Sequence, residues 1–450
     1  MKIILINPPV YDFSAYDVWI KPLGILYLSN ILKKHNFEIV LLDCLDRNFF
    51  LDKPVKENGT GKYPYEVVQK PSVLSNIPLR YKRYGVSKKI IEDFLLTHKD
   101  ARYVIVTSCM SYWYLGVEEI IDTVKRLLPE SKIILGGTYP VIMPEHAKSL
   151  FSSKVALISC KPGFYEVLDY LDIPEKEYYN SFENFPAPDY TLYKRVWYVV
   201  LRLSYGCGNR CTYCATGSIF SDYQVKDIKK VVKEIIELYN LTNCQNFVFY
   251  DDYLPINKRY FLDLFKELSK LNLKIKFFTP NGINPKLISK ETAILLKQLN
   301  FIDPRLSLET VSNLTHNLVD KKVFLKDFEE ALKNLVLAGY NPNEISVYLL
   351  AGLPGETIED VYNSINIMSA YKVRIRLSEL SIVPKSKLFY DLNLDETVDP
   401  LLYNNTIFLF HGIPGKIKPW CNFEEMQQLK NHVKEINSKI NVLDFKESYV

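Results

Sequence analysis

Three cysteines, Cys207, Cys211 and Cys214, lie within eight residues in the stretch SYGCGNRCTYCATG. Thiolates at this spacing can converge on one metal centre, as they do in iron–sulfur and zinc sites. A structural zinc site takes four protein ligands, and the next cysteine and histidine along the chain are Cys244 and His316. Three thiolates on a four-iron cluster would instead leave one iron open to a substrate or cosubstrate. The spacing favours such a cluster, with zinc and chance clustering as alternatives.

Six short apolar runs alternate with amphipathic segments from residue 198 onward, and the three cysteines follow the first run. This alternation indicates buried parallel strands joined by crossover helices. The expected strands are 198–203, 246–250, 273–278, 304–309, 345–350 and 373–380. The expected helices are 225–238, 258–270, 286–299, 325–338 and 357–370. Because a complete (β/α) barrel has eight such units, six units predict a partial, TIM-like barrel.

Polar residues alternate with apolar ones along two of these strands. Helices cover the outside of such a barrel, so the polar side chains are expected to point inward and to make the interior the active site. They are Arg305, Ser307, Glu309, Arg374, Arg376 and Ser378. The three arginines either hold an anionic group or pair across the barrel with Asp251 or Glu309.

The first 172 residues show the same alternation of apolar runs and helical patterns. The expected strands are 2–6, 37–42, 102–106, 132–135 and 154–158. Five parallel strands predict an α/β domain with an open, doubly wound, Rossmann-like sheet, whose ligand crevice lies beyond the carboxyl ends of the strands. Gly136 and Gly137 follow the fourth strand at that edge, where the missing Cβ lets a ligand approach the backbone; a simple tight turn is the alternative.

Four parts of the chain are distinguished by these patterns. Residues 1–172 form the sheet domain, within which 45–84 match neither period and are expected to be an irregular insertion. Residues 173–196, with several prolines, are expected to be a linker. The partial barrel takes 197–395, and 396–450 form a small C-terminal helical extension or lid.

Composition and charge narrow the expected partners and location of the protein. The net charge is +4 and the lysines form no basic block, so no nucleic-acid partner is expected. No apolar run reaches the ~18 residues of a membrane helix, so no membrane partner is expected. Eight cysteines, five of them isolated, form no disulfide framework. A reducing compartment, the cytoplasm, is therefore expected.

The Cys-x-x-x-Cys-x-x-Cys loop after the first barrel strand, with Tyr213 before its last cysteine, resembles the radical S-adenosylmethionine (SAM) enzymes. In that family the three cysteines hold a [4Fe-4S] cluster, and the amino and carboxylate groups of SAM chelate the open iron. The resemblance implies that Cys207, Cys211 and Cys214 are the cluster ligands. It also implies a set of SAM-binding residues near the ends of the strands, namely Tyr213, Asp251, Asp252, Asn281, Ser307, Glu309 and Gly352. Beyond Gly352, Thr357 and Asp360 also predict a helix N-cap pair.

The N-terminal half resembles the cobalamin-dependent branch of these enzymes. The motifs that match in order are Asn7-Pro8-Pro9, Pro22-Leu23-Gly24, Asp43-Cys44, Ser108, Gly136-Gly137 and Pro144-Glu145. The implied cobalamin-binding residues are Pro9, Ser108, Gly136, Gly137 and Thr138. Methylcobalamin domains that ligate cobalt use a histidine in the first loop. Residues 7–24 contain none, so cobalamin is expected without a lower histidine ligand.

The resemblance implies radical chemistry that uses both halves of the chain. SAM would be cleaved to a 5′-deoxyadenosyl radical that takes hydrogen from the substrate, and methylcobalamin would then methylate an unactivated carbon or phosphorus. The expected partners are a small-molecule or peptide substrate and an electron donor such as ferredoxin or flavodoxin. The alternatives are cobalamin-dependent oxidation, hydroxylation or ring formation, a radical SAM enzyme without cobalamin, and a non-catalytic metal-binding protein. Residues 385–388 (Lys-Ser-Lys-Leu) replace the Pro-Gly-Thr turn of many relatives, so the resemblance does not extend to the substrate side.

Overall fold

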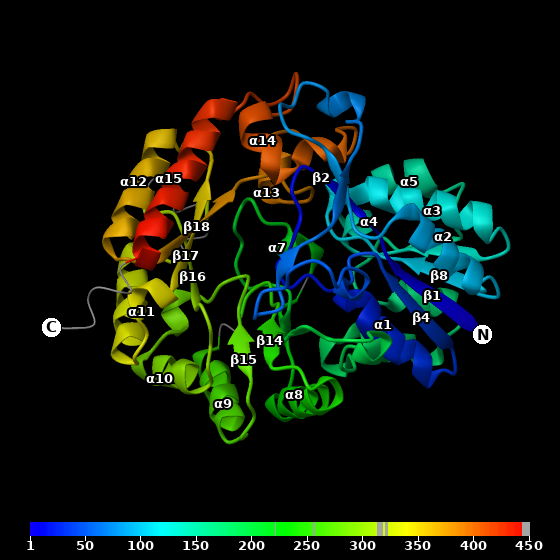
Figure 1. The fold of residues 1–450 in the computed structure, drawn as a ribbon, viewed down its shortest axis with the longest axis horizontal. Coiled ribbons are helices and arrows are strands. Elements are labelled where there is room, and N and C mark those ends of the chain that lie inside the picture. Colours follow the sequence, from blue (N-terminus) through cyan, green and yellow to red (C-terminus); the bar gives the residue numbers. More distant parts are fainter. Residues whose placement is uncertain (221, 255–256, 313–317, 320–322, 443–450) are drawn as a thin grey trace. The chain divides into compact units, whose positions relative to one another are not determined.

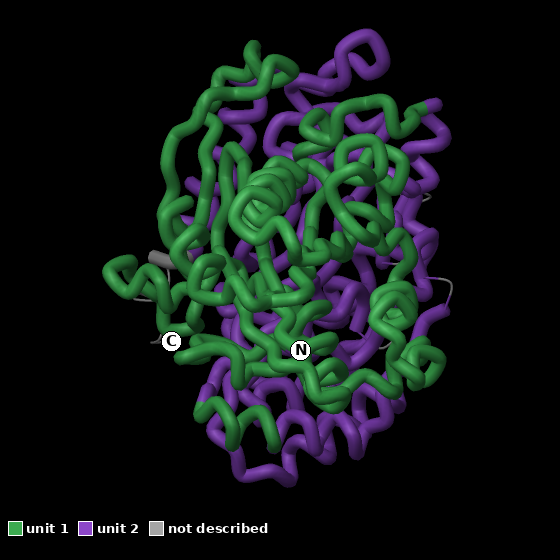
Figure 2. Tube along the Cα trace, turned by 90° about the vertical axis from the view of Figure 1, so that its right-hand side faces the viewer, with its two compact units in different colours: residues 1–200, 237–243, 394–404 green, residues 201–236, 244–393, 405–450 purple. Residues whose placement is uncertain are grey.

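The structure, a computed structural model, describes residues 1–220, 222–254, 257–312, 318–319 and 323–442 (Figure 1). His316, one of the possible zinc ligands, lies outside these residues. The chain divides into two compact units, which Figure 2 colours separately. The first unit comprises 1–200, 237–243 and 394–404, and the second comprises 201–236, 244–393 and 405–450.

A five-stranded parallel sheet forms the core of the first unit. Its strands are β1 (Lys2–Asn7), β4 (Glu38–Asp43), β8 (Tyr103–Val106), β9 (Lys132–Leu135) and β10 (Leu157–Ile158). Their order is β10-β9-β8-β1-β4, and every neighbouring pair is parallel. The order reverses between β1 and β8, so the rule for doubly wound sheets locates the ligand crevice beyond the carboxyl ends of these two strands. The predicted sheet is confirmed.

Helices connect the strands of this sheet. They are α1 (Leu23–Lys34), α2 (Lys88–Thr97), α3 (Tyr114–Leu127), α4 (Thr138–Ile142), α5 (Pro144–Phe151) and α6 (Tyr165–Tyr170). In α3, the residues Val117, Ile120, Ile121 and Val124 are all buried. Their spacing of three, one and three residues gives the helix one apolar side, which packs toward the sheet.

Residues 45–84 are not irregular throughout, so that prediction was partly wrong. The strands β6 (Tyr65–Val67) and β7 (Lys82–Tyr84) form an antiparallel sheet with β2 (Val10–Asp12). The strand β5 (Gly61–Lys62) pairs with β3 (Tyr16–Asp17). Each strand is two or three residues long, too short for an alternating pattern to be recognised in the sequence.

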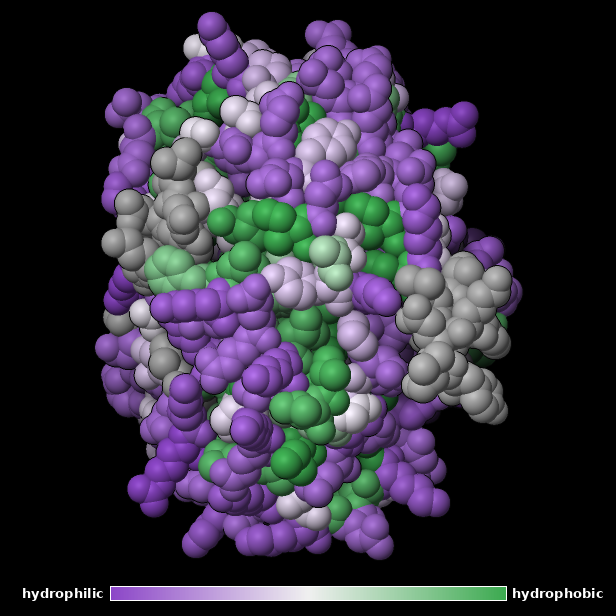
Figure 3. Space-filling view, turned by 90° about the vertical axis from the view of Figure 1, so that its left-hand side faces the viewer, coloured by the Kyte–Doolittle hydropathy of each residue, from purple (hydrophilic) through white to green (hydrophobic). Residues whose placement is uncertain are grey.

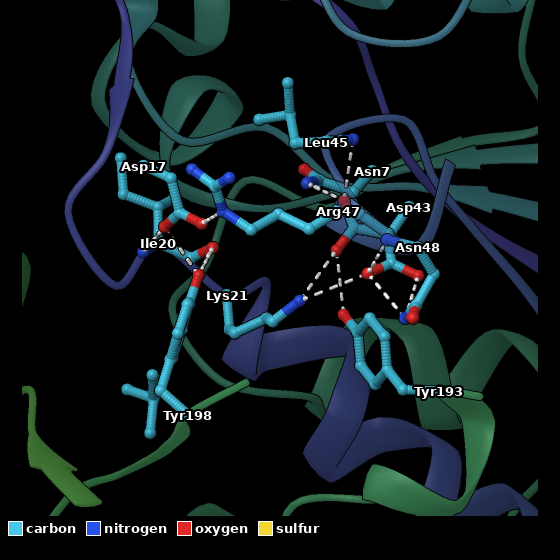
Figure 4. Close-up of polar contacts among 12 residues, drawn as sticks. Asn7, Asp17, Ile20, Lys21, Asp43, Leu45, Arg47, Asn48, Tyr193 and Tyr198 are labelled. Atoms are coloured by element: carbon cyan, nitrogen blue, oxygen red, sulfur yellow. Dashed lines mark hydrogen bonds and ion pairs between the residues drawn. The ribbon is translucent and has the colours of Figure 1, made fainter. Parts of the chain in front are cut away.

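A buried polar network joins the loop after β4 to residues near the end of the first unit (Figure 4). Asp43 accepts hydrogen bonds from Asn7 Nδ2 at 2.7 Å and from the Tyr193 hydroxyl at 2.8 Å. Lys21 Nζ lies 3.8 Å from carboxylate oxygens of both Asp43 and Asp46, and 4.0 Å from the centre of the Tyr193 ring. The predicted linker therefore takes part in the structure of the first unit through Tyr193.

Asp17 forms a second centre of the same network. It accepts hydrogen bonds from Arg47 Nε at 2.7 Å and from the Tyr198 hydroxyl at 2.6 Å. The Arg47 side chain is only 2% exposed, so its charge depends on this carboxylate for compensation. The Tyr198 hydroxyl also donates to Ile20 O at 3.2 Å, which holds the loop before α1 to the end of the first unit.

We expect Tyr198→Phe to lower the free energy of unfolding of the first unit by about 1–2 kcal/mol, because a buried carboxylate loses one of its donors. Urea denaturation measures this loss. Tyr65→Phe is the matched control: Tyr65 is 57% exposed, and its change should stay within about 0.5 kcal/mol. Equal losses for the two variants would contradict a structural role for the Tyr198 hydroxyl.

Six further strands form two three-stranded sheets. The first strand, β11, begins at the end of the first unit, and the other five lie in the second unit. The six strands are β11 (Val199–Leu201), β14 (Asn246–Phe249), β15 (Lys276–Phe278), β16 (Arg305–Glu309), β17 (Ser346–Ala351) and β18 (Arg374–Glu379). The sheet orders are β11-β14-β15 and β16-β17-β18. Parallel bridges between Phe277 and Phe301 and between Ile283 and Leu306 connect the two sheets. The strand prediction is confirmed, and no closed barrel is detected among the described residues.

The helices of this part also match the sequence prediction. They are α8 (Ile228–Thr242), α9 (Lys258–Ser269), α10 (Lys290–Gln298), α11 (Leu325–Leu337) and α12 (Ile358–Ala370). Shorter helices are α7 (Thr216–Ile219), α13 (Lys387–Asp391) and α14 (Asn405–His411). Thr357 and Asp360 form the predicted N-cap pair of α12, with Asp360 N donating to Thr357 Oγ1 at 3.2 Å.

The last helix, α15 (Phe423–Val442), lies beside α12 and against β18 (Figure 1). β18 is an edge strand, so part of its backbone has no strand partner. The Asn437 amide donates to Ile375 O at 2.8 Å and accepts from Ile375 N at 2.9 Å, which satisfies both groups. This helix therefore caps a sheet edge. The sequence had left open whether the C-terminal residues form a helical extension or a lid.

Hydrophilic side chains cover most of the face in Figure 3, and hydrophobic residues gather near its middle. Among the described residues, no helix combines the length and the apolar character that crossing a membrane requires.

Candidate functional site

The three cysteines lie in a loop that begins at the carboxyl end of β11. The loop is closed at its base by β12 (Ser204–Tyr205) and β13 (Gln224–Val225), which pair antiparallel. Gly206 opens the loop with a φ of +83°, and a Cβ there would lie 2.9 Å from the carbonyl oxygen of Asp222. A side chain at this position would be strained, so the glycine allows the loop to turn away from the hairpin.

All three cysteine side chains are half-buried. Cys207 Sγ accepts a hydrogen bond from Asn209 N at 3.4 Å, Cys211 Sγ lies 3.6 Å from Val319 O, and Cys214 Sγ donates to Thr216 Oγ1 at 3.3 Å. Within the part of the chain that the structure describes, no three His, Cys, Asp or Glu side chains converge as a metal site. The loop therefore keeps the three thiols close in sequence but directs them to different neighbours.

The donor set nevertheless fits an iron–sulfur cluster. Three thiols come from one loop, and their contacts in the structure are weak thiol hydrogen bonds that ligation can replace. The loop backbone is held from outside: Thr212 N donates to Leu318 O at 3.0 Å, and Leu388 N donates to Thr212 O at 2.7 Å. Cys244 is buried beside its own strand, where its Sγ lies 3.7 Å from Asn246 O. It is not part of this loop.

Tyr213 lies within the cysteine loop, and Glu309, another predicted SAM-binding residue, is near it. Burial raises the pKa of the Tyr213 hydroxyl well above its ordinary value, and the nearby charges of Glu309, Cys211 and Cys214 act in the same direction. Glu309 has a φ of +73°, in the left-handed region, and the register with β17 shifts between Ser307 and Glu309. Such a conformation is costly for a residue with a side chain and gathers at functional sites.

Asn281, in the turn after β15, lies next to the part of β16 that contains Ser307. Gly282, the second residue of the predicted Asn-Gly turn, has a φ of +90°, and a Cβ on it would lie 2.3 Å from Ser307 Oγ. Only glycine lets the turn after β15 pack directly on β16. Asn281 Nδ2 donates to Asp251 O at 2.9 Å, so the ends of β14, β15 and β16 meet here.

The two neighbouring aspartates differ in environment. Asp251 is 2% exposed, and burial raises its pKa to about 6 against the effect of several hydrogen bonds. Asp252 is half-buried and pairs with Arg202, which donates from two guanidinium nitrogens at 2.9 and 3.3 Å. Arg202 was not singled out in the sequence, although it lies between two leucines in the expected strand 198–203.

Gly352 lies in a loop that Glu356 holds from beneath. The Glu356 carboxylate is 6% exposed and accepts from Gly352 N at 3.1 Å and from Leu353 N at 3.2 Å. Burial raises the pKa of Glu356 from 4.5 to about 7. Gly352 has a φ of +87°, so the loop requires glycine there.

The pKa of Glu356 predicts a pH dependence of stability. Because the folded state binds this proton more tightly, the stabilisation is present below pH 4.5 and is lost as the pH rises toward 7. Relative to Glu356→Gln, which keeps the acceptor oxygen but does not titrate, we expect the wild-type second unit to lose about 3 kcal/mol across this range. Denaturation at several pH values measures the difference. Glu359→Gln, at an exposed position in the first turn of α12, should follow the wild type.

The sequence left open whether the arginines hold an anionic group or pair with Asp251 or Glu309, and two of them pair with a different carboxylate, Asp303. Arg305 Nε donates to Asp303 Oδ2 at 3.0 Å, and Arg376 Nη2 donates to the same oxygen at 2.5 Å. Asp303 lies in the loop before β16, at the opposite end of the strand from Glu309. Arg305 Nη1 also donates to the Tyr348 hydroxyl at 3.0 Å. These groups fill the interior at the amino ends of the strands.

The predicted cobalamin-binding residues meet at the carboxyl edge of the first sheet. Thr138 N donates to Ser108 O at 2.8 Å, and Ser108 Oγ donates to Gly136 O at 3.1 Å. A Cβ on Gly137, whose φ is +91°, would lie 2.3 Å from Ser108 O, whereas a Cβ on Gly136 would have no atom nearer than 4.0 Å. Gly137 therefore serves loop packing, whereas a Cβ on the buried Gly136 would make only an ordinary contact with the Ser159 Cβ.

Pro9 contacts α3 through a glycine that sequence reasoning missed. A Cβ on Gly116 would lie 1.9 Å from Pro9 O, so only glycine lets the helix approach the loop after β1. The available signal in the sequence was the position of Gly116 within an apolar helical pattern, because an isolated glycine in such a pattern often marks close packing. Pro9, Ser108, Gly136 and Gly137 lie on loops that follow β1, β8 and β9, and Thr138 is the first residue of α4. Gly137 and Thr138 are exposed at this edge, so a large cofactor can reach the backbone there.

Residues 394–404 belong to the first unit, although the sequence placed most of them in the C-terminal extension. Asn404 Nδ2 donates to Asp12 Oδ1 at 2.9 Å, and Glu396 Oε2 accepts from Glu145 N at 2.8 Å. No spacing or composition signal connects residues so far apart in the chain.

Three comparisons bear on this arrangement. A family model described as the radical SAM superfamily matches residues 201–368. Ribosomal protein uS12 methylthiotransferase RimO from Clostridium botulinum is 26% identical over 276 residues, which cover 58% of this chain and 54% of that protein. The chain thus spans about half the length of this curated relative.

Two solved structures share the fold over nearly the whole chain. The radical SAM methyltransferase TsrM from Kitasatospora setae, solved with tryptophan substrate and the SAM analogue aza-SAM, has a TM-score of 0.66 at 14% identity. The match covers 98% of this chain and 89% of TsrM. The cobalamin-dependent radical enzyme OxsB, solved with aqua-cobalamin and SAM, has a TM-score of 0.57 at 16% identity and covers 96% of this chain and 61% of OxsB.

Proposed function

We propose that this chain, which carries a radical SAM domain within the fold of the cobalamin-dependent radical SAM enzymes, methylates an unactivated carbon or phosphorus of a small-molecule or peptide substrate. The observation that carries the proposal is the position of the three cysteines, in a loop at the carboxyl end of β11. The proposal is also supported by the contact of Asn281 with Asp251, the packing of Gly282 on Ser307 and the nearness of Glu309 to Tyr213.

The chain's own residues hold and orient the reactants. Cys207, Cys211 and Cys214 are the proposed ligands of a [4Fe-4S] cluster, and Asp252, Glu309 and Gly352 are among the residues proposed to bind SAM. When bound, the cluster supplies an electron to SAM and cobalamin supplies the methyl group. Loops after β1, β8 and β9 form the proposed cobalamin site, without a histidine ligand from residues 7–24. An electron donor such as ferredoxin or flavodoxin completes the reaction.

Anaerobic reconstitution with iron, sulfide and cobalamin tests this proposal. The reduced protein is incubated with SAM and candidate substrates, and 5′-deoxyadenosine and S-adenosylhomocysteine are measured. Both products together support radical methylation. Formation of 5′-deoxyadenosine alone favours cobalamin-dependent oxidation, hydroxylation or ring formation instead. A reconstituted protein that forms neither product contradicts the proposal and favours a non-catalytic metal-binding role.

A further inference from the structure

Asp251 lies two residues beyond β14, and its carboxylate is turned toward the chain that enters the cysteine loop. Oδ1 accepts hydrogen bonds from Leu203 N at 3.0 Å, from Ser204 N at 2.6 Å and from Ser204 Oγ at 2.6 Å. Oδ2 accepts a further contact from Leu203 N at 3.2 Å. At 2% exposure, the side chain has its accepting oxygens directed at protein donors.

These donors belong to the base of the cysteine loop. Ser204 is the first residue of β12 and is paired with Val225 of β13, so its position sets the start of the loop. Ser204 Oγ also lies 3.0 Å from Tyr253 O, and the main chain of Asp251 accepts from Asn281 Nδ2. The ends of β11, β14 and β15 are thereby joined at a point three residues before Cys207.

The neighbouring Asp252 provides a contrast. Its side chain is 23% exposed and is bonded to Arg202, which is itself 18% exposed. A ligand can reach this ion pair from solvent, whereas reaching Asp251 would require breaking hydrogen bonds to two backbone N–H groups. Leaving buried N–H groups without acceptors costs about 1–3 kcal/mol for each group.

We propose that Asp251 is a positioning residue, which holds the base of the cysteine loop and does not contact SAM. This inference rests on the proposed function for the identity of the cluster, and it reassigns Asp251 from the SAM-binding set that the sequence implied. Within the Asp-Asp pair, only Asp252 then remains for the SAM site.

The test compares Asp251→Ala with Asp251→Asn in the full-length chain. Asparagine keeps an acceptor oxygen at the Oδ1 position for all three donors, whereas alanine leaves Leu203 N and Ser204 N without an acceptor. Ser204→Ala, which removes only the hydroxyl donor, is a milder variant that keeps the test valid if Asp251→Ala does not fold. Asp252→Asn is the matched control on the neighbouring residue.

Two measurements are made on each variant. Hydrogen–deuterium exchange of residues 203–225 in the iron-free protein reports the loop without any cluster, and iron content after reconstitution reports loading. We expect Asp251→Ala to speed exchange at least about tenfold, which corresponds to ~1.4 kcal/mol, and Ser204→Ala to speed it less. Asp251→Ala should also load less iron. Asp251→Asn and Asp252→Asn should match the wild type in both measurements.

The affinity of the iron-loaded variants for SAM separates a positioning role of Asp251 from direct contact with SAM. A fall of tenfold or more for Asp251→Asn, with wild-type exchange and full iron, would show that Asp251 contacts SAM and would overturn the inference. Wild-type exchange in both Asp251→Ala and Ser204→Ala would overturn it as well. If the wild-type protein takes up no cluster, the proposed function fails, yet the exchange measurement still decides the role of Asp251 in the loop.

Discussion

Replacing any one of Cys207, Cys211 and Cys214 with alanine should remove most of the iron from the reconstituted protein and abolish cleavage of SAM. The loop has no other cysteine or histidine to replace the lost thiolate, and Cys244 is buried next to its own strand. The expected fall in the rate of 5′-deoxyadenosine formation is at least about 1,000-fold, which corresponds to ~4 kcal/mol of transition-state stabilisation. Iron analysis and product chromatography measure the two effects.

Cys160→Ala is the control for this experiment. Cys160 lies in the first unit, where its Sγ is 3.6 Å from Ile158 O, and it should retain full iron and full cleavage. Thermal melting of the iron-free variants separates loss of the cluster from loss of the fold. Full iron in all three single variants would rule out the cysteine loop as the cluster site.

The second large effect concerns the neighbouring glycines after β9, which should respond in opposite ways. In Gly137→Ala, the new Cβ would lie 2.3 Å from Ser108 O and 2.5 Å from Ser108 N, at a φ of +91°. Both contacts are with backbone, which cannot move aside easily, so we expect the first unit to lose at least about 2 kcal/mol of unfolding free energy. Urea denaturation measures this loss.

Gly136→Ala should leave the fold unchanged and weaken cobalamin binding. Its Cβ would lie 4.0 Å from the Ser159 Cβ, an ordinary contact, so the free energy of unfolding should stay within about 0.5 kcal/mol of the wild type. If cobalamin approaches the backbone at Gly136, affinity should fall at least about tenfold, or ~1.4 kcal/mol. Titration followed by visible absorbance measures this affinity. Wild-type affinity for cobalamin in Gly136→Ala would contradict the proposed site.

Local patterns in the sequence were sufficient for the two series of parallel strands and the helices between them. The strand from 304 to 309 and the helix from 325 to 338 were recognisable because apolar spacing within one segment reflects the side that it buries. The cysteine loop was recognisable for the same reason, since its three thiols lie within one short segment. The strands β3, β5, β6 and β7 were missed because two or three residues carry no period, and their pairing joins distant segments.

Contacts between distant segments were decided only by the tertiary structure. The sequence determined by itself that two series of parallel strands follow one another and that three thiols leave the first strand of the second series. It did not determine that Arg305 and Arg376 share Asp303, or that Asn437 caps β18. Nor did it distinguish Asp251 from Asp252, which are adjacent in sequence. One is saturated by backbone donors and the other pairs with Arg202, because successive residues point to different sides and burial is decided by what the fold brings to each.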